Sequence, residues 1–207
     1  MIVHFLAPDD KKIWPELWKK CLLSWNKYTC VVKIWNDKEI DDYLKCYDPE
    51  FYKIIDKLHK IFKLDYVRYV ILENIGGVYA DMDIELISPF IHQLDKNKIY
   101  IIGASSEDEY VQNSLMISPP SNFWSDYLLF CRQNIITNID TVSKYPHIKE
   151  HIPGYIVRKT VGPIALSEFI QSNYYDSIEI LPADLFNNSK NISFTKHHQT
   201  GTWGFFD

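Results

Sequence analysis

The chain has 207 residues, of which 46% are apolar and 15% aromatic, so it can bury one substantial core in a single domain spanning residues 1–207. It carries 22 Lys and Arg against 27 Asp and Glu, a net charge of -5, and it has no run of five or six basic residues. This balance argues against nucleic acid as a partner and against a polybasic membrane-binding surface.

Signals for secretion and for membrane insertion are not visible in the pattern. The opening MIVHFLAPDDKKIW lacks a basic segment followed by a long apolar one, so we expect no secretory signal. No stretch of about 18 apolar residues predicts a transmembrane helix, and work at a membrane would need peripheral recruitment. The 4 cysteines have no CxxC spacing and are typical of reduced thiols, so we expect a cytoplasmic protein.

The first part of the chain predicts a strand, a helix and a second strand. MIVHFL, residues 1–6, is short and apolar, as a buried strand would be. Pro15 fits the first turn of a helix that runs to about Asn26 with apolar residues along one side. CVVKIW, residues 30–35, predicts the next strand. This order is typical of an α/β fold with a parallel sheet.

The middle of the chain predicts helices followed by a strand. Residues 38–75 have a helical pattern, and the last of these helices begins at about Lys60 and is stopped by Gly76 and Gly77. VYADMDIEL, residues 78–86, then predicts one continuous strand.

The rest of the chain predicts a similar mixture. Two strands, two helices and a short strand are expected, in the order 99–105, 111–118, 122–136, 162–171 and 177–181. The polar stretch 137–162 and the tail from residue 182 are expected to be irregular. No internal repeat or linker divides the sequence, which favours one domain.

The strand expected after the two glycines carries three carboxylates at alternating positions, Asp81, Asp83 and Glu85. Alternate residues of a strand point to the same side, about 7 Å apart. Buried carboxylates this close repel one another unless a cation compensates them. Two cations could do so: a divalent metal, or Arg68, which shares one face of the preceding helix with Asp65.

A site at the end of this strand would suit a phosphorylated ligand. In open α/β sheets ligands bind beyond the carboxyl ends of strands, which is where Asp83 would emerge. Carboxylate oxygens favour Mn²⁺ or Mg²⁺, and a metal on Asp83 would stabilise the charge of a departing nucleoside diphosphate. Asp81 and Asp65 would then hold hydroxyls of the ribose or the sugar, with Glu85 as support behind them.

Each of these residues also has an ordinary structural explanation. A D-x-D pair alone is common on solvated acidic surfaces, and Arg68 could make only a surface ion pair with Asp65. Tyr79 could pack in the core, and Asn113 could begin its strand without reaching a ligand. The apolar surroundings of the acidic pair and the Gly-Gly before it favour a functional site.

The segment KLDYVRYVILENIGGVYADMD, residues 63–83, resembles the core of the DXD sugar-binding glycosyltransferases of family 32. That core has an Asp, an Arg three residues later, an aliphatic stretch, Gly-Gly, Tyr and DxD, and the glucosylating bacterial toxins share the arrangement. Shorter segments elsewhere are also similar to the family: IVH, PELW, KIWND, NSLMISPP, VGP and HHQTGTW.

The resemblance implies a GT-A-type α/β fold with a mostly parallel central sheet flanked by helices. It also implies a Mn²⁺- or Mg²⁺-dependent retaining enzyme, which moves a hexose or N-acetylhexosamine from a UDP- or GDP-linked donor to a glycan or other hydroxyl acceptor. Catalysis would then involve Asp65, Arg68, Asp81 and Asp83. The expected donor-binding residues are Asp65, Arg68, Tyr79, Asp81, Asn113 and Trp203.

In the same resemblance Asp83 is the principal metal ligand, next to Asp81. His197 or His198 would complete the metal or diphosphate site from the tail, and Trp203 would close over the diphosphate.

Two other functions stay open at this point. Nucleotidyltransferases also place paired strand carboxylates after a glycine turn, but they leave room for a helix in between, whereas Gly77 lies four residues before Asp81. A catalytically inactive module could keep a sugar-nucleotide cleft without turnover.

Overall fold

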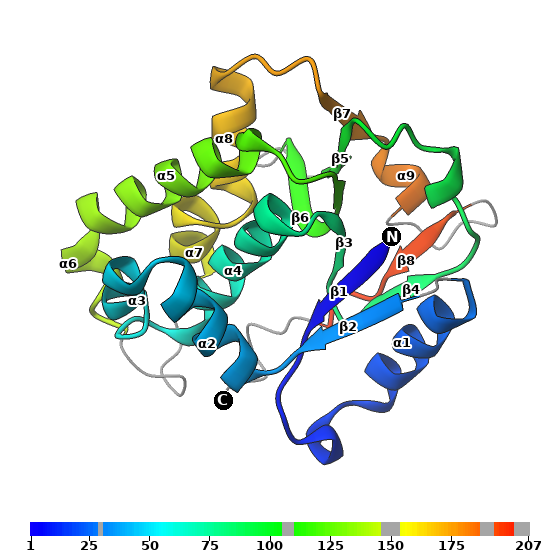
Figure 1. Cartoon of the computed structure of the whole chain (residues 1–207), viewed down its shortest axis with the longest axis horizontal. Coiled ribbons are helices and arrows are strands. Elements are labelled where there is room, and N and C mark those ends of the chain that lie inside the picture. The colour runs from blue at the N-terminus through cyan, green and yellow to red at the C-terminus, as the bar shows by residue number, and fades with distance from the viewer. Residues whose placement is uncertain (29–30, 105–109, 146–153, 187–192, 201–207) are drawn as a thin grey trace.

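The computed structural model describes residues 1–28, 31–104, 110–145, 154–186 and 193–200 (Figure 1). The strands are β1 (Ile2–Leu6), β2 (Val31–Trp35), β3 (Gly77–Ala80), β4 (Ile84–Leu86), β5 (Ile99–Gly103), β6 (Val111–Ser118), β7 (Ile178–Leu181) and β8 (Thr195–His197). The helices are α1 (Glu16–Tyr28), α2 (Asp37–Tyr47), α3 (Pro49–Ile55), α4 (Lys60–Asn74), α5 (Asn122–Thr137), α6 (Ile139–Val142), α7 (Gly154–Thr160), α8 (Pro163–Ser172) and α9 (Ala183–Phe186).

Six of these strands form the central sheet, in the order β2-β1-β3-β6-β5-β7. β1 pairs in parallel with β2 and β3, β5 pairs in parallel with β7, and β6 runs antiparallel between β3 and β5. Only β6 therefore opposes the other five strands. The expected α/β fold with a mostly parallel sheet is confirmed.

Two hydrophobic cores cover the two faces of this sheet. Figure 1 shows α2 to α8 gathered on one side, and α1, α9 and the two-stranded sheet of β4 and β8 on the other. The first core contains Tyr69, Met116 and Trp124, and the second contains Trp25 and Leu115. Within the described ranges no helix has the length and apolarity needed to cross a membrane.

Helix α4 is the central helix of the first layer. Ten of its 15 residues are buried, and they lie all round the helix axis, as expected for a helix enclosed by protein. Its apolar side chains account for most of this burial, yet Asp65 and Arg68 are among the buried residues. Helix α4 therefore places one carboxyl group and one guanidinium cation in the protein interior.

The continuous strand predicted over residues 78–86 is wrong. β3 ends at Ala80, and the chain turns so that the Ile84 N–H donates to the Asp81 carbonyl at 3.0 Å. β4 then pairs with β8 in a separate sheet. Asp is well suited to turns, so alternating carboxylates fit a turn as readily as a strand. Asp81, Asp83 and Glu85 consequently do not share one strand face.

Two segments expected to be irregular contain regular structure. Helices α6 and α7 lie within residues 137–162, of which 146–153 are outside the described residues. The tail from residue 182 contains α9 and β8. Both elements are short: β8 is stabilised by pairing with β4, and α9 packs against β8 and β5. A local sequence pattern does not reveal such long-range contacts.

The Gly-Gly turn joins α4 to β3 in a conformation that other residues rarely adopt. Gly76 has φ +66° and Gly77 has φ +103°. The carbonyl of Gly76 is 2.9 Å from His4 Nε2, and His4 Nδ1 accepts from Trp35 Nε1 at 3.1 Å. Since Nδ1 is an acceptor, Nε2 carries the proton and donates to Gly76. The turn is thereby fixed against β1.

Replacing Gly77 with Ala should destabilise the protein by at least about 2 kcal/mol. The added Cβ would lie 2.4 Å from the Ile2 carbonyl oxygen, in a backbone conformation that is already strained for L-residues. Urea denaturation measures the change. Gly154→Ala is the matched control, because nothing lies within 4 Å of its Cβ position and Ala favours the helix. Equal stability of Gly77→Ala and the wild type would contradict the need for glycine there.

Candidate functional site

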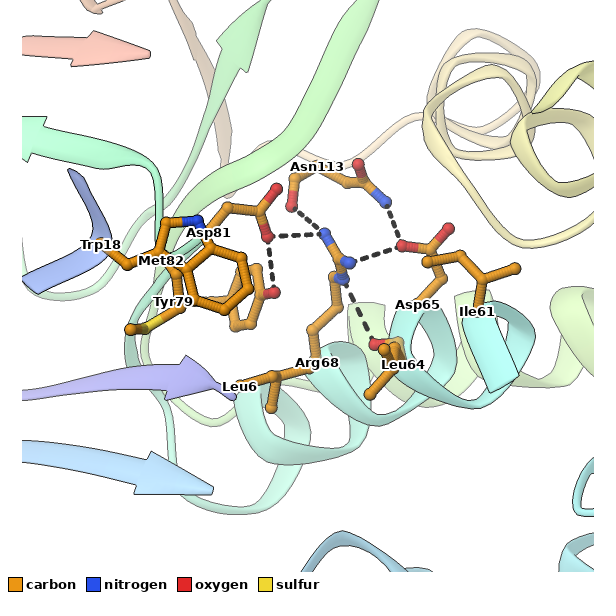
Figure 2. A pocket seen from close by; sticks show the side chains of 10 residues that line it. All are labelled: Leu6, Trp18, Ile61, Leu64, Asp65, Arg68, Tyr79, Asp81, Met82 and Asn113. Atoms are coloured by element: carbon orange, nitrogen blue, oxygen red, sulfur yellow. Dashed lines mark hydrogen bonds and ion pairs between the residues drawn. The ribbon is translucent and has the colours of Figure 1, made fainter. Parts of the chain in front are cut away.

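A pocket of about 80 Å³ lies beyond the carboxyl ends of β1 and β3 (Figure 2). Its polar lining comes from α4, β3 and β6, and its apolar lining comes from β1, α1 and the start of α4. The lining residues are Leu6, Trp18, Ile61, Leu64, Asp65, Arg68, Tyr79, Asp81, Met82 and Asn113. The position is the one expected for a ligand site in an open α/β sheet.

Arg68 is the centre of the polar lining, and only 6% of its surface is exposed. Its Nη2 lies 2.6 Å from Asp65 Oδ1, and its Nη1 lies 3.3 Å from Asp81 Oδ1. Nη1 also donates to the Asn113 carbonyl at 3.0 Å, and the guanidinium lies 4.7 Å from the Tyr79 ring centre. One buried cation therefore compensates both carboxylates, as Figure 2 shows.

Burial governs the protonation of these two acids. It raises the pKa of Asp65 to about 6, although the charge of Arg68 acts in the opposite direction. It also raises the pKa of Asp81 above its ordinary value, again against the effect of Arg68. The Tyr79 hydroxyl donates to Asp81 Oδ1 at 2.7 Å and orients that carboxyl group.

Asp65, which lines the pocket, has one carboxylate oxygen without a hydrogen-bond partner. Asn113 Nδ2 donates to Asp65 Oδ1 at 3.3 Å and also lies 2.8 Å from the Tyr69 hydroxyl, which in turn donates to the Val161 carbonyl. Asp65 Oδ2 is buried and has no hydrogen-bond partner in the described structure. A buried oxygen in this state costs free energy until a donor, such as a ligand hydroxyl, reaches it.

Asp81, Asp83 and His197 form the second part of the site. One ligand atom from each of them can be chosen so that all lie within 4.8 Å of one another. His197 Nε2 is 3.3 Å from Asp83 Oδ1, while Asp83 Oδ2 accepts from both the N–H and the hydroxyl of Thr200 at 2.9 Å. The β4–β8 pairing, with Ile84 opposite His197, brings the tail to the acidic turn.

The chemistry of these three residues fits Mn²⁺ or Mg²⁺. Burial pushes the pKa of Asp83 upward, but the contacts with His197 and Thr200 lower it to about 2, so the group is ionised at neutral pH. Burial pushes the pKa of His197 down, but the contact with Asp83 raises it overall. Asp81, Asp83 and His197 would hold such a cation through carboxylate oxygens and an imidazole nitrogen, which are donors that suit either ion.

The two adjacent histidines lie in different surroundings. His198 Nε2 is 2.9 Å from Glu85 Oε2, and Lys20 lies 3.0 Å from the same carboxylate. The structure thus brings His197, but not His198, to the group of Asp81 and Asp83. Trp203, which was expected to close over the diphosphate, lies outside the described residues.

Sequence reasoning missed two residues of the site. Thr200 contacts Asp83, and its place three residues after the first histidine of the tail was the signal available. Trp18 lines the pocket from α1, and no local pattern distinguishes it from the other aromatic residues of that helix.

The fold is that of GT-A glycosyltransferases. The solved structure of PaToxG glycosyltransferase superposes with a TM-score of 0.52 at 12% identity, covering 83% of this chain and 68% of that chain. Residues 14–101 match the family model described as the glycosyltransferase sugar-binding region containing the DXD motif. The resemblance to DXD glycosyltransferases that the sequence suggested is therefore found over this region of the chain.

Two curated proteins are similar in sequence over longer stretches. The uncharacterized glycosyltransferase L373 of Acanthamoeba polyphaga mimivirus is 27% identical over 171 residues, which are 79% of this chain and 64% of that protein. Inositol phosphoceramide mannosyltransferase 1 of Schizosaccharomyces pombe is 26% identical over 214 residues, covering 98% of this chain and 61% of that protein. The chain thus spans less than two thirds of the length of either relative.

Proposed function

We propose that the protein transfers a hexose or N-acetylhexosamine from a UDP- or GDP-linked donor to a hydroxyl acceptor such as a glycan, with a divalent cation. The observation that carries this proposal is the position of Arg68, which joins the Asp65 side of the pocket to Asp81 at the cation group. A sugar and its diphosphate would occupy these two places side by side.

The sugar lies over Asp65, Arg68 and Asn113 in this proposal. Asp65 Oδ2 accepts from a sugar hydroxyl, which supplies the partner that this buried oxygen lacks. Arg68 already contacts both carboxylates in the free protein and acts by holding Asp65 and Asp81 in place. The named activity of the fission yeast relative makes mannose one of the hexoses to test.

The diphosphate lies at Asp81, Asp83 and His197. When bound there, Mn²⁺ or Mg²⁺ would neutralise the charge that develops on the departing diphosphate. Asp83 suits this role because it is ionised, while Tyr79 and Arg68 fix the orientation of Asp81.

We further propose that the configuration at the anomeric carbon is retained. The pocket carboxylates Asp65 and Asp81 both contact Arg68, which makes each a poor nucleophile for a covalent intermediate. Departure of the diphosphate and attack of the acceptor would then occur on the same face, with the leaving phosphate taking the acceptor proton. A trapped covalent glycosyl-enzyme would contradict this mechanism.

Donor binding should raise the melting temperature only when cation and nucleotide are both present. Saturation at a hundred times Kd adds about 2.7 kcal/mol, or roughly 5–11 °C for a chain of this size. Melting is measured with UDP and with GDP, each with Mn²⁺ or with EDTA, and the nucleotide that gives the shift identifies the base of the donor.

The absence of a shift under all conditions would contradict the proposal. A shift without measurable transfer from any matching sugar nucleotide would indicate a binding module without turnover.

A further inference from the structure

Trp18 differs from the other tryptophans in the described parts of the chain. Its side chain is buried, with 7% of the residue exposed, yet its Nε1 has no hydrogen-bond partner there. The other four donate to acceptors at 2.8–3.1 Å: Trp14 to the Pro8 carbonyl, Trp25 to the Ile84 carbonyl, Trp35 to His4 Nδ1 and Trp124 to Ser118 Oγ.

An unpaired indole N–H in the interior is a cost that a core tryptophan ordinarily avoids. The four paired tryptophans show that this fold supplies acceptors where the indole serves packing alone. Trp18 lines the pocket, so a ligand bound there can bring the missing acceptor. The unpaired N–H of Trp18 therefore indicates that this side chain takes part in binding a ligand in the pocket.

The pocket has a polar side and an apolar side. In the view of Figure 2 the indole of Trp18 overlaps Tyr79 and lies on the side of Arg68 away from Asp65. A flat apolar surface opposite a cluster of charged groups suits a ligand with a planar or weakly polar part joined to a hydroxyl-rich part.

The order of groups in a sugar nucleotide decides which part faces Trp18. With the sugar at Asp65 and the diphosphate at the Asp81–Asp83–His197 group, the nucleoside falls on the side of the indole. We propose that Trp18 binds the nucleoside of the donor, with the indole packed against it and Nε1 donating to one of its oxygens. This inference rests on the proposed function and adds a binding residue to it.

Trp18→Phe should weaken nucleotide binding while the free protein stays folded. UDP and GDP with Mn²⁺ are titrated calorimetrically, and we expect Kd to rise about 5- to 20-fold for Trp18→Phe and further for Trp18→Ala. The melting temperature of ligand-free Trp18→Phe should fall by less than that of Trp14→Phe, because both variants lose packing but only Trp14→Phe also loses a hydrogen bond. Trp14→Phe, the matched control, loses a paired N–H and should melt lower with unchanged Kd.

The possible results separate this inference from the proposed function. If the wild type binds neither nucleotide, both fail. If the wild type binds and both Trp18 variants keep its Kd, the role of Trp18 is refuted while the proposed function stands. Weaker binding of a complete sugar nucleotide, with unchanged affinity for UDP and GDP, would place the indole at the sugar and overturn the nucleoside assignment.

Discussion

Replacing Asp83 with Asn should reduce sugar transfer by at least about 10²–10³-fold while the protein stays folded. Asp83 contributes a carboxylate to the cation group, and its low pKa keeps that carboxylate charged. Asn has nearly the same shape and still offers one oxygen to Thr200, so the turn can persist. The charge that a cation needs is removed.

The initial rate of sugar transfer is measured at increasing Mn²⁺ concentration. Mn²⁺ binding is measured separately, from the electron paramagnetic resonance signal of the free ion. Glu85→Gln is the matched control, since it also removes a nearby carboxylate. The Glu85 carboxylate contacts His198 and Lys20 and does not belong to the cation group. Wild-type rates and Mn²⁺ affinity in Asp83→Asn would remove this residue from the cation site.

Replacing Arg68 with Ala should destabilise the protein by about 3–5 kcal/mol at neutral pH, because the change leaves two buried carboxylates without their cation. Asp65 and Asp81 both contact the guanidinium, and burial already raises the pKa of each. Without Arg68 these pKa values rise further above those of the unfolded chain. The folded variant then binds more protons than the unfolded one, so its stability falls as pH rises.

The destabilisation should therefore be smaller at pH 5 than at pH 8, as measured by urea denaturation at both values. Lys19→Ala breaks an exposed ion pair of the same helical spacing, with Glu16, and should change stability by less than about 0.5 kcal/mol. Adding Asp65→Asn to Arg68→Ala should restore part of the loss. A loss that is equal at both pH values would contradict buried charge as its cause.

Local spacing predicted part of the site well. Asp65 and Arg68 are three residues apart on a helix, so their contact followed from helix geometry. The Gly-Gly stop also placed Asp81 back beside Arg68, where the structure has it. The prediction of one continuous strand over residues 78–86 was wrong, because carboxylates at every second position fit a turn between two short strands equally well.

Long-range packing decides the remainder. Whether His197 or His198 meets Asp83 depends on the register of β8 on β4, and adjacent residues of a strand point to opposite sides. The place of Trp18 depends on how α1 packs against β4, a contact between segments more than 50 residues apart in the sequence. Neither contact has a signal within its own stretch of sequence.

The pairing of β8 with β4 also gives the protein an order of assembly. The family region ends at residue 101, yet the imidazole and hydroxyl that contact Asp83 come from His197 and Thr200. During synthesis α4, β3, the acidic turn and β6 emerge from the ribosome well before these residues do. The nascent chain can thus form its sugar pocket early, but it acquires a complete cation site only after residues 195–200 have been made and β8 has paired with β4.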